Sequence, residues 1–189
     1  MDLVIFDLET TGLSPARDEI IQIAGVRMRG GQILETETFS TFVKPRGPIS
    51  GFISSYTGIT NRHVADAPGA AEAVAAFSAF VGGAVLIAHN GRRFDMPFLR
   101  ETCRREALPT REIGFVDSID LSRQLWGGRG GHGLDAVMER LQLSGDGARR
   151  HDARGDVQIL AEAVRHMWSR LGPDFGTCPV PRGTGCVAR

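Results

Sequence analysis

Two acids near the N-terminus have a spacing that favours metal chemistry. Asp7 and Glu9 alternate with apolar residues at the end of a short apolar run. In a strand, alternate side chains share a face, so both carboxylates point the same way. Neighbouring buried carboxylates repel each other, and a bound divalent cation removes the electrostatic cost of this repulsion. Oxygen ligands favour Mg²⁺ or Mn²⁺ over zinc. If the strand end is solvated instead, both acids are ordinary surface residues.

Two later segments hold the remaining residues suited to chemistry. Asp95 follows His89 and Asn90 where a strand should end and a helix should begin, a place where the helix dipole favours a carboxylate. His151 stands five residues before Asp156 at the start of the last expected helix, where an imidazole could take the proton of a water molecule. Each segment also has a plainer interpretation, as helix caps in the first case and as a surface histidine with a first-turn acid in the second.

The elements expected around these residues form one α/β domain. Apolar runs predict strands over 3–8, 20–28 and 33–43, and two consecutive glycines between the last two predict a hairpin, so these strands should form an antiparallel meander. The connection over 44–67 should be irregular, with a short helix near Asn61. The remaining expected elements alternate along the chain: helices at 70–81, 93–106, 119–126, 134–141 and 153–171, and strands at 84–88 and 115–116. This order predicts a mixed sheet flanked by helices.

Length and composition narrow the function classes. A chain of 189 residues suits one domain, here 1–171, followed by a flexible Gly- and Pro-rich tail over 172–189. A formal net charge of zero argues against bulk electrostatic binding of nucleic acid, and 7% aromatic residues argue against extensive base stacking. A nuclease that relies on bound metal stays open. With no apolar run near the length of a membrane span and no signal peptide, we expect a cytoplasmic protein with no membrane partner.

Taken in order, the three polar segments resemble those of the DEDDh (DnaQ-like) 3′–5′ exonuclease family. That family carries Asp-x-Glu on its first strand, an Asp after a His-Asn turn, and His-x4-Asp on a late helix. The resemblance covers about Leu3 to Met167 and looks most like the proofreading epsilon branch of bacterial DNA polymerase III. A tyrosine would mark the sister subclass at the position that Asp152 occupies. One departure is Gly91, where alanine is common, and this exchange of one small residue for another puts little in doubt.

The resemblance implies a ribonuclease H-like sheet and a specific reaction. Its members hydrolyse the terminal phosphodiester of single-stranded DNA, or of a frayed 3′ end, and release nucleoside 5′-monophosphates. Carried over to this chain, it assigns two Mg²⁺ or Mn²⁺ ions to the four acids and the general base to His151. The acids are Asp7, Glu9, Asp95 and Asp156, and the implied substrate contacts are Thr10, Leu13, Asn90 and Phe94. A DNA polymerase subunit is the implied protein partner.

Arginines beside the motifs are candidates for phosphate binding. Apart from Lys44, every basic residue is an arginine, and a solvated surface is the plainer interpretation of any one of them. The five that lie next to a motif are Arg92, Arg93, Arg149, Arg150 and Arg154.

Three other functions are alternatives to this one. An exoribonuclease of the same family stays open, because no residue of the sequence declares a contact to a 2′-hydroxyl. A non-catalytic nucleic-acid-binding module is disfavoured, since all four acids and the histidine are present. The pattern of Asp7, Glu9 and Thr11 faintly resembles that of HAD-type phosphatases, but those need Asp at the second position and a lysine late in the chain. The only lysine here is Lys44.

Overall fold

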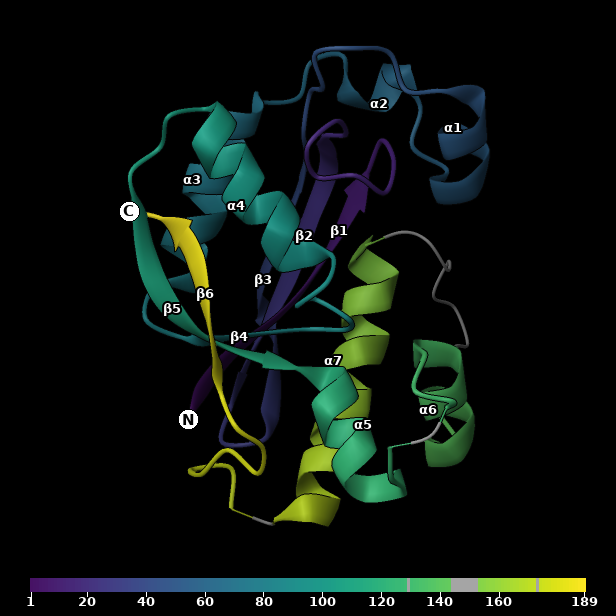
Figure 1. Cartoon of the computed structure of the whole chain (residues 1–189), viewed down its shortest axis with the longest axis vertical. Helices are drawn as coiled ribbons and strands as arrows, with labels where there is room; N and C mark the ends of the chain where they lie inside the picture. The colour runs from purple at the N-terminus through teal and green to yellow at the C-terminus, as the bar shows by residue number, and fades with distance from the viewer. Residues whose placement is uncertain (129, 144–152, 173) are drawn as a thin grey trace.

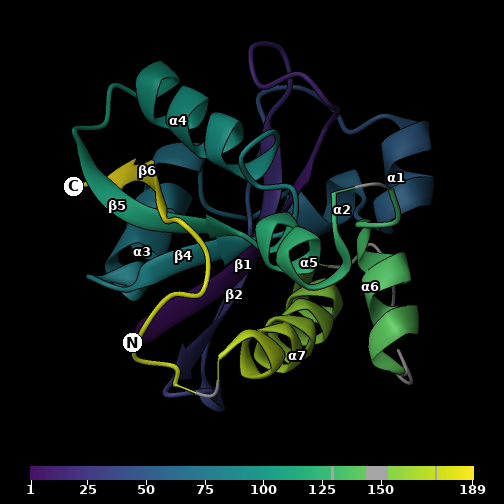
Figure 2. The same cartoon turned by 60° about the horizontal axis from the view of Figure 1, so that its bottom comes forward.

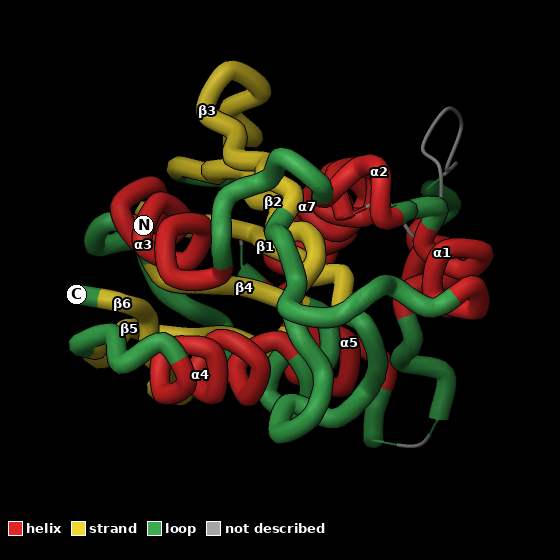
Figure 3. The backbone as a smooth tube through the Cα atoms, turned by 90° about the horizontal axis from the view of Figure 1, so that it is seen from above, coloured by secondary structure: helices red, strands yellow, loops and turns green. Residues whose placement is uncertain are grey.

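Six strands form one mixed sheet with helices on both of its faces. The computed structural model describes residues 1–128, 130–143, 153–172 and 174–189, without the side chain of Arg154. The strand order is β3-β2-β1-β4-β5-β6 (Figures 1 and 3). The strands are β1 Asp2–Thr10, β2 Ile20–Arg29, β3 Gln32–Phe42, β4 Val85–Ala88, β5 Thr110–Asp117 and β6 Gly183–Ala188. The helices are α1 Gly51–Thr57, α2 Asn61–Val64, α3 Ala70–Val81, α4 Asp95–Arg105, α5 Ser118–Trp126, α6 Leu134–Leu141 and α7 Ala153–Leu171.

The pairing of the strands confirms the predicted fold class. β1, β2 and β3 are antiparallel to one another, and β1, β4 and β5 are parallel. The hairpin between β2 and β3 turns on Gly30 and Gly31, both at positive φ, which explains why two glycines stand there. The mixed α/β sheet expected from the order of the elements is therefore present.

β1 lies at the centre of the sheet and is buried on both faces. Val4 and Phe6 pack into the cluster formed with α3 and α4, whereas Leu3 and Ile5 pack into the cluster formed with α5, α6 and α7 (Figure 2). A strand covered on both sides needs apolar residues at every position, which explains the unbroken run before Asp7. The strand that presents the first two acids is thus among the most firmly held parts of the chain.

The longest helix, α7, runs along the face of the sheet formed by β1 and β2. Trp168, Met167 and Val164 are fully buried between this helix and the strands. No helix in the described part of the chain combines the length and the apolar composition that a bilayer crossing requires.

The connection after β3 contains one more helix than the sequence predicted. α2 lies at the expected place, but α1 precedes it, with Ser50 as its N-cap and Gly58 as its C-cap at φ 75°. The Ser50 side chain accepts a hydrogen bond from the Ile53 amide at 3.2 Å. These caps offset the weak helix propensity of the intervening residues, which is why the segment is easily mistaken for a loop.

The predicted flexible tail is wrong for residues 183–188, which form β6. This strand pairs antiparallel with β5 along the whole range from Thr110 to Phe115. Val187 is fully buried in the same cluster as α3 and α4, and the Ala188 amide donates to Ser78 Oγ at 3.0 Å. A short strand with glycines has little propensity of its own, so its order comes from pairing with the edge of the sheet.

Shortening Val187 tests whether β6 belongs to the core. We expect Val187→Ala to lower the free energy of unfolding by about 2 kcal/mol, because it removes buried methyl groups and leaves a cavity. Thr184→Ala, at an exposed position of the same strand, should cost less than about 1 kcal/mol. Denaturant unfolding of both variants measures the difference, and equal costs would show that β6 does not contribute to folding.

Candidate active site

Three carboxylates meet at the carboxyl end of β1. Asp7, Glu9 and Asp156 each offer an oxygen, and these oxygens lie within 4.8 Å of one another. Asp7 and Glu9 share one face of β1 through strand alternation, and Asp156 lies in the first turns of α7, whose start lies beside that strand end (Figure 1). Residues almost 150 positions apart in the sequence therefore form one cluster.

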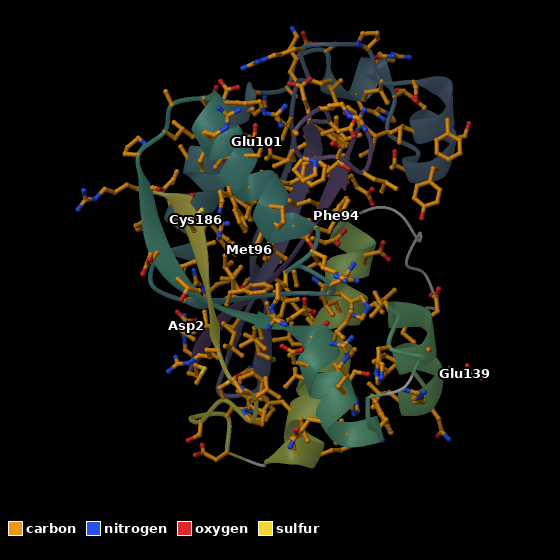
Figure 4. The ribbon with its side chains drawn as sticks, viewed as in Figure 1. Asp2, Phe94, Met96, Glu101, Glu139 and Cys186 are labelled. Atoms are coloured by element: carbon orange, nitrogen blue, oxygen red, sulfur yellow. The ribbon has the colours of Figure 1, made fainter. Side chains whose placement is uncertain are left out.

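The fourth acid, Asp95, lies at the start of α4 and lines the same cavity as the other three acids. It is 1% exposed, and its Oδ1 atom has no hydrogen-bond partner within the described residues. Figure 4 shows the preceding residue, Phe94, where the first turn of α4 comes close to the start of α7. A buried carboxylate oxygen without a donor is costly, and a cation would remove that cost.

The electrostatics of the cluster show how unfavourable four negative charges are here. Burial, together with the charges of Asp117 and Glu9, raises the pKa of Asp95 to about 8, although hydrogen bonds from the Asp95 and Leu8 backbone amides partly oppose the rise. The pKa of Asp7 is also raised, first by burial and then by the charges of Asp95, Glu9 and Asp156. A set of hard oxygen ligands with unmet negative charge suits a divalent ion such as Mg²⁺ or Mn²⁺.

A buried glutamine ties the start of α7 to the sheet. Gln22 of β2 is 1% exposed, and its Oε1 accepts the Ala153 amide at 3.3 Å. Gln22 is also the register partner of Glu9 across the β1–β2 ladder. This contact sets the first residue of the helix that carries Asp156 beside the strand that carries Glu9. A polar residue inside an apolar strand was the only sequence signal for it.

Asp117 fixes the turn between β4 and α4, although nothing in the sequence had singled it out. Its carboxylate accepts three backbone amides, those of Asn90 and Arg92 at 3.0 Å each and that of Ile119 at 3.1 Å. Asn90 itself has φ 59°, a left-handed conformation that these bonds hold in place. Its place between a strand and a helix predicts an N-cap residue. An N-cap explains the hydrogen bond from the Ile119 amide but not those from the Asn90 and Arg92 amides.

All four predicted substrate contacts line the cavity that holds the acids. This cavity has a volume of about 650 Å³, and its walls include Thr10, Leu13, Asn90 and Phe94. The hydroxyl of Thr10 donates to the Gly12 carbonyl at 2.6 Å, so it also shapes the loop after β1. The ring of Phe94 packs against Phe98 at 4.9 Å between centroids and belongs partly to the core.

Several predicted residues lie outside the described part of the chain. These are His151, Arg149 and Arg150, together with the side chain of Arg154. Arg92 does not line the cavity that holds the acids: it forms a 2.6 Å ion pair with Asp120, which raises the pKa of the guanidinium. The role of the histidine and the phosphate-binding role of most of these arginines therefore stay predictions.

Gly91 is not interchangeable with alanine in this chain. A Cβ atom at this position would lie 2.6 Å from the Ala88 Cβ and 3.0 Å from the nearest ring atom of Phe115. The turn before α4 thus lies directly against β4 and β5, and this close approach explains why glycine stands at this position.

Comparison with known proteins identifies the family. The RNase T family model, described as "Exonuclease", matches residues 4–164, which is most of the chain. The chain belongs to this exonuclease family. That match confirms the DEDDh resemblance drawn from the three polar segments, and the domain is that of an enzyme.

Two similar proteins are named after DNA polymerase III. The chain is 42% identical over 174 residues to a DNA polymerase III subunit epsilon-like protein of Rhodobacter capsulatus, which covers 90% of this chain and 24% of the relative. It is 38% identical over 170 residues to the PolC-type DNA polymerase III of Caldanaerobacter subterraneus, covering 90% of this chain and 12% of the relative. The chain therefore spans a quarter or less of the length of these relatives.

Solved structures share the fold. Exonuclease X, solved in complex with 5′ overhanging duplex DNA, superimposes with a TM-score of 0.70 at 26% identity and covers 90% of this chain and 93% of its own. The nuclease domain of 3′hExo, a DEDDh family member bound to rAMP, gives a TM-score of 0.78 at 19% identity over 96% of each chain. This second likeness shows the fold alone, and together they confirm a ribonuclease H-like architecture.

Replacing Asp95 tests whether the charges of the buried acids destabilise the fold when no metal is bound. An acid whose pKa is higher in the folded chain stabilises the fold at low pH, and this stabilisation is lost as the pH rises from the ordinary value of 3.8 to about 8. In a chelator at about pH 8, Asp95→Asn should therefore be more stable than wild type by on the order of 1–3 kcal/mol. Added Mn²⁺ should reverse that order, because the intact cluster binds the ion.

Denaturant unfolding across the pH range measures this difference. Asp66→Asn, which removes an exposed carboxylate far along the sequence from the cluster, is the matched control and should change stability by less than about 0.5 kcal/mol. An Asp95→Asn variant that is less stable than wild type in chelator at every pH would contradict the electrostatic description.

Replacing Asp117 tests the support of the β4–α4 turn. We expect Asp117→Ala to lower the free energy of unfolding by about 2–4 kcal/mol, because it leaves three backbone amides without their charged acceptor. Asp120→Asn weakens only partly exposed ion pairs, those with Arg92 and Arg123, and should cost less than about 1 kcal/mol. Thermal unfolding compares the two. If they are equally mild, Asp117 does not hold the turn.

Proposed function

We propose that this domain is a 3′–5′ exonuclease that removes nucleotides from single-stranded or frayed 3′ ends of DNA. The observation that carries the proposal is the gathering of four carboxylates, Asp7, Glu9, Asp95 and Asp156, in one open cavity. A cavity of about 650 Å³ admits a nucleotide, and its walls offer both polar and apolar side chains.

The four carboxylates would hold two Mg²⁺ or Mn²⁺ ions. Bound there, the ions would supply positive charge to the phosphodiester and lower the pKa of the attacking water. Glu9 and Asp156 approach Asp7 from β1 and α7, so a ligand held by all three has its position fixed by the core of the fold. Asp95 adds a buried oxygen, Oδ1, that accepts no hydrogen bond from the described residues.

The remaining residues of the site would orient the substrate and move the proton. Thr10 and Leu13 would contact the terminal nucleotide, and Asn90 and Phe94 would line the path of the strand. An imidazole nitrogen of His151 would accept the proton of the water as its oxygen bonds to phosphorus and the bond to the 3′-oxygen breaks. The products are a nucleoside 5′-monophosphate and a strand shortened by one residue with a new 3′-hydroxyl.

DNA is the substrate that the relatives favour, with proofreading beside a polymerase as the setting. The 42% identical relative is named as a DNA polymerase III epsilon-like protein, and Exonuclease X was solved with DNA. Because both relatives are named after DNA polymerase III, we propose that this domain acts next to a DNA polymerase as its partner.

Digestion of matched DNA and RNA oligonucleotides, labelled separately at each end, tests the reaction. With Mg²⁺ or Mn²⁺, a 3′ label should be released at once as mononucleotide, while a 5′-labelled strand shortens step by step. Asp7→Asn and His151→Ala should each lower the rate by about 10²- to 10⁴-fold, with Asp66→Asn as the unaffected control. The wild-type rate should rise through about pH 6–7 as the base loses its proton.

The outcomes separate the parts of the proposal. Faster loss of RNA than of DNA would assign the domain to exoribonucleolysis. Variants that match wild type would remove Asp7 and His151 from the mechanism, and a profile flat from about pH 5.5 to 8 in saturating metal would remove the histidine base.

A further inference from the structure

Three large hydrophobic side chains stand exposed in the described part of the chain, and all of them border the cavity with the acids. Leu13 is 85% exposed, Phe52 is 76% exposed and Tyr56 is 55% exposed. Each lines the same cavity as Asp7 and Asp95. Elsewhere on the described surface, apolar side chains of this size are at least partly covered. Their concentration at one cavity indicates a surface that binds something.

Two of these side chains present flat, nearly parallel rings. Phe52 and Tyr56 lie one turn apart on α1, with ring centroids 6.4 Å apart and an angle of 10° between the rings. They are joined to the acidic cluster by a continuous cavity wall, although α1 itself stands at the margin of the molecule, off the end of the sheet (Figures 1 and 3). The rings are thus placed to meet a ligand that leaves the cavity.

α1 is held firmly enough to serve as a support. Ser50 caps its start, and Thr57 Oγ1, which is buried, donates to the Ile53 carbonyl at 2.9 Å. Ile53 packs on the small cluster formed by Ile21, Ile49 and Ile59. The helix therefore packs the side that carries Ile53 and Thr57 against the protein and leaves the two rings exposed on its other side.

The charges around the rings decide which part of a strand they contact. The sequence of α1, from Gly51 to Thr57, contains no charged residue. The helix therefore offers phosphate groups no charge-assisted contact, and the acids of the cavity repel them in the absence of metal. The face of a nucleobase needs only an aromatic surface, since every base has a π-face. Base faces are therefore the part of a strand that this helix suits.

We propose that Phe52 and Tyr56 form a stacking platform for the unpaired bases that precede the terminal nucleotide. This inference rests on the proposed exonuclease function and adds to it where the rest of the strand lies. Paired bases cannot offer their faces to the rings, so the platform selects single-stranded or frayed ends with little regard to sequence. A low aromatic content is compatible with such binding because two rings at one place are sufficient.

Steady-state kinetics of Phe52→Ala, Tyr56→Ala and the double variant test the platform. On single-stranded oligonucleotides we expect the double variant to raise KM roughly tenfold with kcat little changed, because it loses binding and not chemistry. Tyr56→Phe, which keeps the ring, should raise KM far less than Tyr56→Ala does. Ser55→Ala, at an exposed position of the same helix that does not line the cavity, is the matched control.

Two altered substrates separate base stacking from other effects. In an oligonucleotide with abasic sites at the second and third positions from the 3′ end, wild type and the double variant should have similar KM values. With the p-nitrophenyl ester of thymidine 5′-monophosphate, which has no upstream base, the variant should lose far less kcat/KM than with the oligonucleotide. The melting temperature of the variant should stay within about 2 °C of wild type, since the rings are exposed.

Each result supports or overturns the platform. An unchanged KM on intact oligonucleotides overturns it, and the rings then serve another purpose such as contact with a protein partner. An equal rise in KM on abasic substrate overturns it as well. If wild type cleaves neither the oligonucleotide nor the ester, the exonuclease proposal fails separately. Fluorescence anisotropy with the same intact and abasic strands then still tests stacking, with the same expected difference in Kd.

Discussion

Mutual repulsion among four gathered carboxylates is the constraint on which the rest of this structure depends. Asp7, Glu9 and Asp156 place oxygens within 4.8 Å of one another, and Asp95 is buried beside them. Their burial and their charges raise the pKa of Asp7 and Asp95, so the fold bears a cost at this point. Such a cost persists only where the surrounding structure enforces it, and bound cations are the simplest means of relieving it.

The enforcement comes from elements that are stable for other reasons. β1 is buried on both faces at the centre of the sheet, so its end cannot move away from the cluster. Gln22 fixes the start of α7, and Asp117 fixes the turn before α4 through three backbone amides. The acids that repel one another are thus each attached to a rigid element, and the repulsion cannot separate them. The same rigidity would position bound ions and a strand end.

Much of this could be predicted from the sequence, and what could not has a common physical origin. Local pattern predicted the central strands and the hairpin at Gly30, because alternation and turn residues are short-range signals, whereas the four acids were assigned together only through the ordered resemblance to the exonuclease family. β6 was missed since its order comes from pairing with β5, and Asp117 was missed since its three partners meet only in the folded turn. The rings of α1 were counted in the composition, but their exposure at the cavity depends on tertiary packing. The place of His151 stays a prediction.

Calorimetric titration of Mn²⁺ into the wild-type domain and the Asp7→Asn variant tests the central claim most directly. We expect about two ions to bind each wild-type chain, with more protons released at about pH 6.5 than at about pH 8.5, because acids with raised pKa must ionise to become ligands. The variant should bind fewer ions and bind them more weakly. Absence of saturable binding in wild type, or identical binding in the variant, would contradict the assignment of the carboxylate cluster as a metal centre.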